Sequence, residues 1–299
     1  MVSYNKLSDY LKGRFGCKVY KLALDGGMTC PNRDGTLGRG GCIFCAADGS
    51  GAFAQTGSSV LEQIERAKGR VAAKIKDGKY IAYFQNFTNT YASVEYLTPL
   101  FEAAINHPDV AVLSIATRPD CLGEDVLCLL ERLNRIKPVW VELGLQTVHE
   151  RTAKYIRRGY ELSVYDKAVR ELKARNIEVI THVILYLPGE SEDEMLQTVR
   201  YAAKYSDGIK LQLLHVLRGT DLEKDYEEGK FTLPDMEEYA RFAAKCIKNI
   251  PSNVVIHRIT GDGAKKDLIA PIWTGDKKRV LNTMQKIFDE ENAVQGSLL

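Results

Sequence analysis

The sequence predicts an α/β fold, an incomplete (β/α)6 barrel of the TIM type with a C-terminal α/β extension. Short runs rich in β-branched and aromatic residues alternate six times with segments of helical periodicity. The runs are almost continuously apolar, which is typical of parallel strands covered by helices. Six units are too few for a complete eight-stranded barrel. An open, doubly wound sheet is the alternative, although the first strand-to-helix loop lacks the Gly-x-Gly-x-x-Gly pattern of that class.

The elements of the barrel follow one another at short spacing. The expected strands are residues 18–24, 79–85, 110–116, 139–145, 178–186 and 208–216. The expected helices are residues 59–76, 93–106, 123–135, 163–175 and 191–204. Serine, a preferred N-cap residue, stands at the expected start of four helices: Ser59, Ser93, Ser163 and Ser191. Glu194 follows Ser191 by three residues, which predicts a capping box.

The chain changes character at about residue 232. A helix is expected over 234–249, a short strand over 254–259 and a last helix over 276–290. No low-complexity linker precedes this segment, so we expect residues 232–299 to pack on a core formed by residues 1–231.

Composition narrows the function classes. The 299 residues include 41 Lys and Arg against 39 Asp and Glu, a formal net charge of +2, so no global field favours nucleic acid, although a local basic patch remains open. The apolar stretches are far shorter than the ~20 residues that span a bilayer. Residues 1–12 carry no apolar signal region. We therefore expect a cytoplasmic protein with no membrane partner.

Three of the seven cysteines, Cys30, Cys42 and Cys45, lie close together with the spacing C-x11-C-x2-C. An odd number of cysteines without a secretion signal disfavours a disulfide framework. The three could be small buried side chains or part of a zinc site. Structural zinc takes four ligands, commonly from two C-x2-C pairs, and only one pair is present. We favour a [4Fe–4S] cluster on three thiolates within the glycine-rich loop 26–50, with one iron open to another ligand.

Polar residues stand near the carboxyl ends of the expected strands, where parallel α/β folds bind ligands. They are Gln85, Asn86, Arg118, Glu142, Gln146 and His182, with Lys210, Gln212 and His215 on the sixth strand. Arg118 could equally pair with Asp120, and a histidine in an apolar run is more often a satisfied core residue. Glu142 stands in a strand expected to be buried on both faces. Such a carboxylate needs a cation or several donors.

Several motifs resemble those of radical S-adenosylmethionine (SAM) enzymes in the branch of the Elongator catalytic subunit, and especially a bacterial family of similar length. They are the cysteine loop, Thr-Arg-Pro-Asp at 117–120, Val-Glu-Leu-Gly-Leu-Gln at 141–146, Leu-Pro-Gly-Glu at 187–190 and Ala-Pro-Ile-Trp at 270–273. The superfamily's usual spacing is C-x3-C-x2-C, but a long first gap is characteristic of this branch.

The resemblance implies both cofactors and their ligands. Cys30, Cys42 and Cys45 would ligate three irons of a [4Fe–4S] cluster, and SAM would chelate the fourth. Gln85 and Asn86 would occupy the position at which the backbone of the superfamily's enzymes contacts the SAM amino group. The other residues expected to contact SAM are Arg118, Glu142, Gln146, Arg158 and His182. Arg158 lies in Arg-Arg-Gly-Tyr, where the branch has Asn-Arg-Gly-His. The resemblance also implies reductive cleavage of SAM to a 5′-deoxyadenosyl radical that abstracts hydrogen from substrate.

The same resemblance implies a tRNA substrate, because the branch modifies wobble uridine. A basic cluster in the tail is consistent with it: Lys265, Lys266, Lys277, Lys278 and Arg279, beside Trp273, which could stack a base. The concrete expectation is conversion of a carboxymethylaminomethyl group at C5 toward aminomethyl, with an electron donor such as flavodoxin or ferredoxin. The alternatives are a radical SAM enzyme acting on a small metabolite or peptide, and a non-catalytic iron–sulfur or zinc module.

Overall fold

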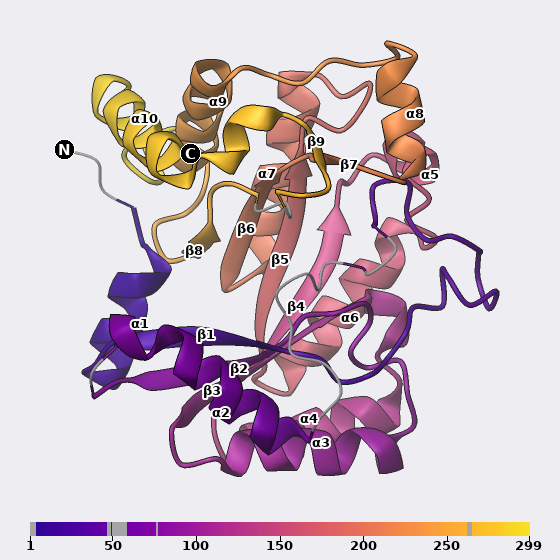
Figure 1. Cartoon of the computed structure of the whole chain (residues 1–299), viewed down its shortest axis with the longest axis vertical. Helices are drawn as coiled ribbons and strands as arrows, with labels where there is room; N and C mark the ends of the chain where they lie inside the picture. Colours follow the sequence, from indigo (N-terminus) through magenta and orange to yellow (C-terminus); the bar gives the residue numbers. More distant parts are fainter. Residues whose placement is uncertain (1–3, 47–48, 50–58, 76, 262–264) are drawn as a thin grey trace.

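The computed structural model of the protein describes residues 4–46, 49, 59–75, 77–261 and 265–299. Its main sheet has seven parallel strands in the order β1-β2-β3-β4-β5-β6-β8. The sheet curls into a partial barrel with β1 and β8 at its two edges (Figure 1). The strands are β1 (Val19–Leu24), β2 (Lys79–Phe84), β3 (Val110–Thr117), β4 (Val139–Gln146), β5 (Glu178–Leu185), β6 (Gly208–Leu213) and β8 (Val255–Arg258).

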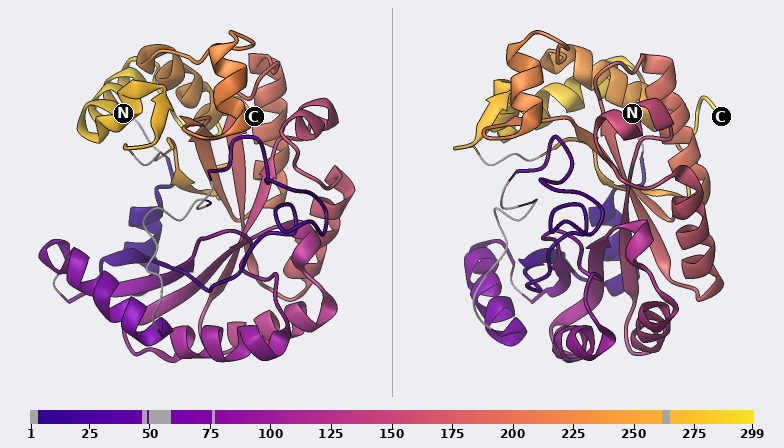
Figure 2. Two further views of the ribbon diagram at one scale, coloured as in Figure 1. Left: turned by 45° about the vertical axis from the view of Figure 1, so that its right-hand side comes forward. Right: turned by 90° about the vertical axis from the view of Figure 1, so that its right-hand side faces the viewer.

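Helices between consecutive strands cover the convex side of the sheet, and the cysteine loop crosses its open side (Figure 2). The covering helices are α2 (Val60–Val71), α3 (Val94–Asn106), α4 (Glu124–Asn134), α6 (Leu162–Ala174) and α7 (Glu192–Tyr205). The main apolar core lies between these helices and the sheet. The remaining helices are α1 (Leu7–Phe15), α5 (Glu150–Tyr155), α8 (Asp221–Glu227), α9 (Met236–Lys248) and α10 (Lys277–Glu290).

The expected fold class is confirmed, and each expected strand and crossover helix is present. The sixth strand is shorter than expected: β6 ends at Leu213, and β7 (Val216–Leu217) pairs antiparallel with β9 (Leu268–Ala270). The first expected helix ends at Val71 and continues as a 3-10 turn (Ala72–Lys74), while residue 76 lies outside the described residues. The helices α1, α5 and α8 were not expected, because segments this short show little periodicity.

Three of the four expected serines occupy an N-cap, and two of these three make the side-chain capping hydrogen bond. Ser59 accepts a hydrogen bond from the Glu62 backbone N–H, and Ser191 forms the full capping box. Ser93 occupies the N-cap of α3 without a side-chain cap bond. Ser163 is not a cap, because α6 begins one residue earlier with Glu161 at its N-cap. Caps read from sequence can thus miss by one or two positions where the surrounding packing fixes the helix start.

A second, smaller apolar cluster closes the barrel at the amino ends of the strands. Inward-facing Ile81, Val112, Trp140 and Ile180 pack there against Leu11 of α1. We call this cluster the apolar floor. Successive side chains along a strand point to opposite faces of the sheet. The residues two positions further along each strand therefore form the next inward layer toward the carboxyl ends. That layer is polar and belongs to the site described below.

The C-terminal extension is part of the same sheet, since it contributes β8 beside β6. The division at residues 231/232 stays a prediction. Trp273 donates a hydrogen bond of 3.1 Å to the Pro234 carbonyl, and its ring lies 5.9 Å from that of Tyr239. The indole is therefore engaged in packing, which weakens the idea that it stacks a base. Within the described part of the chain, no helix has the length and apolar character needed to cross a bilayer.

Candidate functional site

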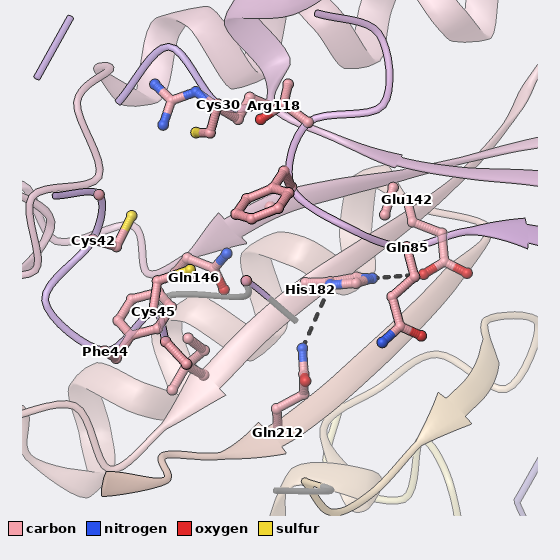
Figure 3. A pocket seen from close by; sticks show the side chains of 18 of the residues that line it. Cys30, Cys42, Phe44, Cys45, Gln85, Arg118, Glu142, Gln146, His182 and Gln212 are labelled. Carbon is pink, nitrogen blue, oxygen red and sulfur yellow. Dashed lines mark hydrogen bonds and ion pairs between the residues drawn. The ribbon is translucent and has the colours of Figure 1, made fainter. Parts of the chain in front are cut away.

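A cavity of about 350 Å³ opens at the carboxyl ends of the strands. The three clustered cysteines line one side, and Glu142, His182 and Gln212 line another (Figure 3). The loop that carries the cysteines follows β1 directly, so the chain delivers it to the edge where parallel folds bind ligands. The sequence expectation that the cysteine loop and the strand ends meet is therefore confirmed.

The loop between Cys30 and Cys45 is fixed by hydrogen bonds to the segment after α5. Asn32 donates from Nδ2 to the Arg157 carbonyl at 2.6 Å, and the same nitrogen lies 3.6 Å from the Cys42 sulfur. The Ile43 backbone N–H donates to the Ile156 carbonyl. Gly41 has a φ of 82°, and a Cβ there would lie 2.9 Å from Arg33 Nε. Glycine is thus needed at that turn for the loop to close.

The three thiols fit an iron–sulfur cluster better than zinc. Burial first, then the neighbouring Cys45, raises the pKa of Cys42 to about 11. A buried thiol becomes a thiolate only beside a strong positive charge, and a bound metal centre supplies it. Tetrahedral zinc holds its sulfurs roughly 3.8 Å apart, from a Zn–S distance of ~2.3 Å. Among the described residues, the loop offers no three ligand atoms within 4.8 Å of one another.

Gln146 ends β4 in an unusual conformation beside the cavity. Its φ is 67°, in the left-handed region that non-glycine residues seldom adopt, and the pairing of β4 with β5 shifts register there. The side-chain Oε1 is buried without a hydrogen-bond partner among the described residues. Backbone strain and an unpaired buried acceptor together indicate a position shaped for a ligand that donates a hydrogen bond.

Two arginines brace the cavity wall. Arg118 makes a two-pronged contact with Asp120, at 2.9 and 2.7 Å, and its Nη1 donates to the Arg158 carbonyl at 2.9 Å. Burial disfavours the charged form of Arg118, yet Asp120 outweighs that effect and raises its pKa. Both guanidinium groups lie over the ring of Tyr160, at 4.9 and 4.7 Å.

Arg158 is 1 % exposed, and protein acceptors already engage each of its nitrogen atoms. They are the carbonyls of Leu145, Thr147 and Tyr160 and the carboxylate of Glu150. This bonding makes Arg158 a brace for the end of β4. A contact with a SAM carboxylate remains a prediction for this residue.

Glu142 lies 1 % exposed inside the barrel, four residues before the end of β4. Lys21 contacts its Oε1 at 3.0 Å, Ser114 donates to the same oxygen at 2.8 Å, and Lys210 contacts Oε2. His182 Nε2 lies 2.7 Å from Oε2, and Gln212 Nε2 lies 3.4 Å from His182 Nδ1 (Figure 3). The expectation that this carboxylate needs cations and donors is confirmed.

Charge and burial set the protonation of this layer. Burial opposes ionisation of Glu142, but Lys21, Lys210 and His182 overcome it and hold the pKa well below its usual range. Burial, then the charge of Lys210, lowers the pKa of His182 to about 4, so that its imidazole is neutral at neutral pH.

Most residues expected to contact cofactors do meet around one cavity. Its lining includes Cys30, Cys42, Cys45, Gln85, Arg118, Glu142, Gln146, Arg158 and His182. Asn86 follows Gln85 but does not line the cavity, and its buried Oδ1 has no partner among the described residues. The roles of these residues toward a cluster or SAM stay predictions. Their placement provides three thiols, an unpaired acceptor and several donors around one cavity.

Sequence reasoning missed Lys21, Tyr160 and Arg258, and gave Lys210 no role. Lys210 and Arg258 line the cavity, as does Tyr160, whose hydroxyl donates to the Gly144 carbonyl. The signal that could have found Lys210 is strand periodicity. Lys210 pairs in register with His182, which stands one inward position beyond the Glu142 layer on the next strand.

The partial barrel, the three-cysteine loop at its carboxyl edge and the polar cavity together define a class of enzyme that binds an iron–sulfur cluster beside a small-molecule ligand. The sequence comparisons name the family. The profile of the Radical SAM superfamily matches residues 33–202, and that of the Radical SAM C-terminal domain matches residues 206–290. The chain belongs to the radical SAM superfamily. It is an enzyme whose cofactors are a [4Fe–4S] cluster and SAM.

The chain is similar over nearly its whole length to two bacterial proteins. It is 45 % identical to YtqA of Bacillus subtilis, covering 98 % of this chain and 92 % of that protein. It is 37 % identical to YhcC of Escherichia coli, covering 99 % and 95 %. A solved structure of archaeal Elp3 from Methanocaldococcus infernus superposes with a TM-score of 0.69 at 18 % identity, covering 92 % of this chain and 63 % of that chain. That likeness supports the fold.

A more distant relative carries a functional name. The tRNA uridine(34) acetyltransferase of Dehalococcoides mccartyi is 29 % identical over 154 residues, which are 50 % of this chain and 33 % of that protein.

Proposed function

We propose that this radical SAM enzyme acts on tRNA and converts a carboxymethylaminomethyl group at C5 of the wobble uridine to an aminomethyl group. The observation that carries the proposal is sequence similarity to a tRNA uridine(34) acetyltransferase, which shares half of this chain. Position 34 is the wobble position. A cytoplasmic site of action follows from a tRNA substrate.

Exposed cations in the C-terminal extension support a polyanionic substrate. Asp267 lines the cavity, and the exposed Lys265 and Lys266 precede it. The first turn of α10 has no acidic residue and carries Lys277, Lys278 and Arg279. Cations at a helix N-terminus are unfavourable by a few tenths of a kcal/mol each. Phosphate groups of a nucleic acid would offset that disadvantage.

The cofactors, once bound and given an electron by a carrier such as flavodoxin or ferredoxin, supply a radical that removes hydrogen from carbon. In the proposed substrate the reacting C–H bond lies between the amine and the carboxylate. Loss of this hydrogen and of one further electron leaves a C=N bond, and SAM, which becomes methionine and 5′-deoxyadenosine, takes up both electrons. Water then adds to the C=N carbon and the C–N bond breaks. The products are the aminomethyl group and glyoxylate.

In this reaction the chain holds the cavity wall in position and excludes water from the cavity. The cavity wall braced by Arg118 and Arg158 holds the end of β4 in place. Phe44 and Phe87 line the cavity and limit the access of water to it. Excluding water keeps a radical from being quenched by unintended donors.

The test uses anaerobically reconstituted protein with SAM, a reductant and tRNA that carries the carboxymethylaminomethyl group. We expect 5′-deoxyadenosine, glyoxylate and aminomethyl nucleoside in equal amounts, measured by chromatography and mass spectrometry. Cys45→Ala should lose all three products, whereas the exposed Cys128→Ala should retain them. SAM cleavage that the tRNA does not stimulate, with unchanged nucleosides, would refute the proposal and favour a small metabolite or peptide.

A further inference from the structure

The strand β4 ends in a strained turn centred on Gln146. The Thr147 backbone N–H donates to the Leu145 carbonyl at 2.9 Å, across Gln146, whose φ is 67°. A hydrogen bond between residues two apart around a positive φ is the mark of the rarer, strained form of the γ-turn. Such a conformation persists only where the surrounding structure fixes it. The contacts that fix this turn therefore decide where the Gln146 side chain lies.

The turn directs the amide of Gln146 back over its own strand. A Cβ at position 144 would lie 2.8 Å from Gln146 Nε2, so the amide needs glycine there. Gln146 lines the cavity (Figure 3), and its Oε1 is buried without a hydrogen-bond partner among the described residues. A buried acceptor without a donor is unfavourable. SAM carries such donors on its ammonium group and its ribose.

Glu190, in the Leu-Pro-Gly-Glu segment that follows β5, anchors the residue after Gln146. The Thr147 side chain is fully buried, and its Oγ1 donates to Glu190 Oε1 at 2.5 Å. The same Oγ1 accepts the His149 backbone N–H at 3.0 Å. Burial raises the pKa of Glu190, and the Thr147 hydroxyl opposes this rise. The side chain of Thr147 is thus held in one orientation by Glu190.

The segment that carries Glu190 is tied to the chain after β4 at two further points. Arg151 Nη2 donates to the Gly189 carbonyl at 2.7 Å, and His149 Nε2 lies 2.9 Å from the Glu194 carbonyl. Thr147 and Glu190 are not among the described residues that line the cavity. Glu190 can therefore act on a ligand in the cavity only through the turn.

We propose that Glu190 is a positioning residue for SAM: through Thr147, its carboxylate holds the γ-turn that presents Gln146 to the cofactor. This role depends on a contact between Gln146 and SAM, and not on the identity of the substrate. Without the hydrogen bond to Glu190 the turn relaxes, and SAM must restore the strained conformation when it binds. We expect the Kd for SAM to rise about tenfold, which equals about 1.4 kcal/mol and matches the strain that one such residue stores.

The first test measures the Kd for SAM of anaerobically reconstituted protein by equilibrium dialysis without tRNA. Glu190→Ala removes the acceptor and should raise the Kd about tenfold. Glu190→Gln keeps an oxygen that can accept from Thr147, so its affinity should stay close to that of the wild type. Glu192→Ala is the matched control, because it removes an exposed carboxylate two residues further on, which pairs with Lys245 at 3.1 Å. It should not change the Kd.

A second comparison separates positioning from general support of the fold. Gln146→Ala alone should raise the Kd. Adding Glu190→Ala to it should raise the Kd no further, within about twofold, because the side chain that Glu190 positions is already gone. A double variant in which the two single effects multiply would overturn the proposal. So would an unchanged Kd in either single variant.

Two provisions keep the outcome decisive. If Glu190→Ala does not fold, Thr147→Val removes the donor of the same hydrogen bond and replaces it in both comparisons. SAM binding can be measured even if the enzyme does not act on tRNA. A failure of the proposed function is therefore distinguishable from a failure of the role of Glu190.

Discussion

Replacing Glu142 with glutamine tests the charge balance inside the barrel. The change keeps the size of the side chain and removes the negative charge that contacts both Lys21 and Lys210. Burial already lowers the pKa of Lys210 well below its ordinary value, and the charge of Glu142 is the group that opposes this. Without that charge, the folded protein relieves the repulsion most readily by releasing the Lys210 proton.

The expected loss of folding stability follows from the release of the Lys210 proton. Loss of one partner of a buried ion pair lowers stability by roughly 3–5 kcal/mol. Because the pKa of Lys210 is already lowered in the wild type, the loss stays below the roughly 4–5 kcal/mol that deprotonating a lysine of ordinary pKa takes at pH 7. For a chain of this length, with an unfolding entropy of roughly 0.6 kcal/mol per degree, we expect Tm to fall by about 5–7 °C. Urea unfolding of the two proteins at matched pH measures the same difference.

The titration of Lys210 also determines how the stability difference between variant and wild type changes with pH. In the variant the folded-state pKa of Lys210 lies below its unfolded value, so the unfolded chain binds more protons and stability rises with pH. The deficit relative to wild type should therefore shrink as the pH rises, by at most about 1.4 kcal/mol per pH unit, because the pKa of Lys210 is lowered in the wild type too. A deficit below about 1 kcal/mol at pH 7, or one that does not change with pH, would refute this reasoning.

Two further substitutions test the cavity wall and the loop. Arg158→Met leaves four acceptors without their donor, and we expect the free energy of unfolding to fall by about 3–5 kcal/mol; a loss of SAM binding at unchanged stability would contradict the role of brace. Asn32→Leu removes the amide donor 3.6 Å from the Cys42 sulfur, so the reduction potential of the cluster should become more negative in an EPR-monitored titration. An unchanged potential would show that this contact does not reach the cluster.

Local patterns in the sequence predicted the parts of the site that depend on few residues. The spacing of Cys30, Cys42 and Cys45 indicates the loop without any knowledge of the fold. The position of Gln146 after an apolar run indicates a strand end, and the structure places it beside the loop. The buried strand around Glu142 already required compensation for its charge. These predictions succeed because each rests on a short segment with its own chemistry.

The two lysine partners of Glu142 were beyond such reasoning. Lys21 and Lys210, like Arg258 in the same cavity lining, come from strands that are far apart in sequence, and their meeting depends on the register of the sheet. That register shifts between Gly144 and Gln146 and again between Ile209 and Lys210. No pattern in the sequence predicts these shifts in register. The same holds for α1, whose role as part of the apolar floor depends on where the barrel leaves Trp140 uncovered.

The strand β8 is synthesised long after the cysteine loop, and this delay affects how the protein assembles. Cys45 leaves the ribosome 213 residues before Arg258, the last residue of β8. At roughly 5–20 residues per second this is about 10–40 s. Throughout that interval the cysteine loop exists while one edge of the barrel does not. A nascent chain thus passes through a stage in which the three thiols are made but Arg258, which completes the cavity lining from the last strand of the sheet, has not yet been added.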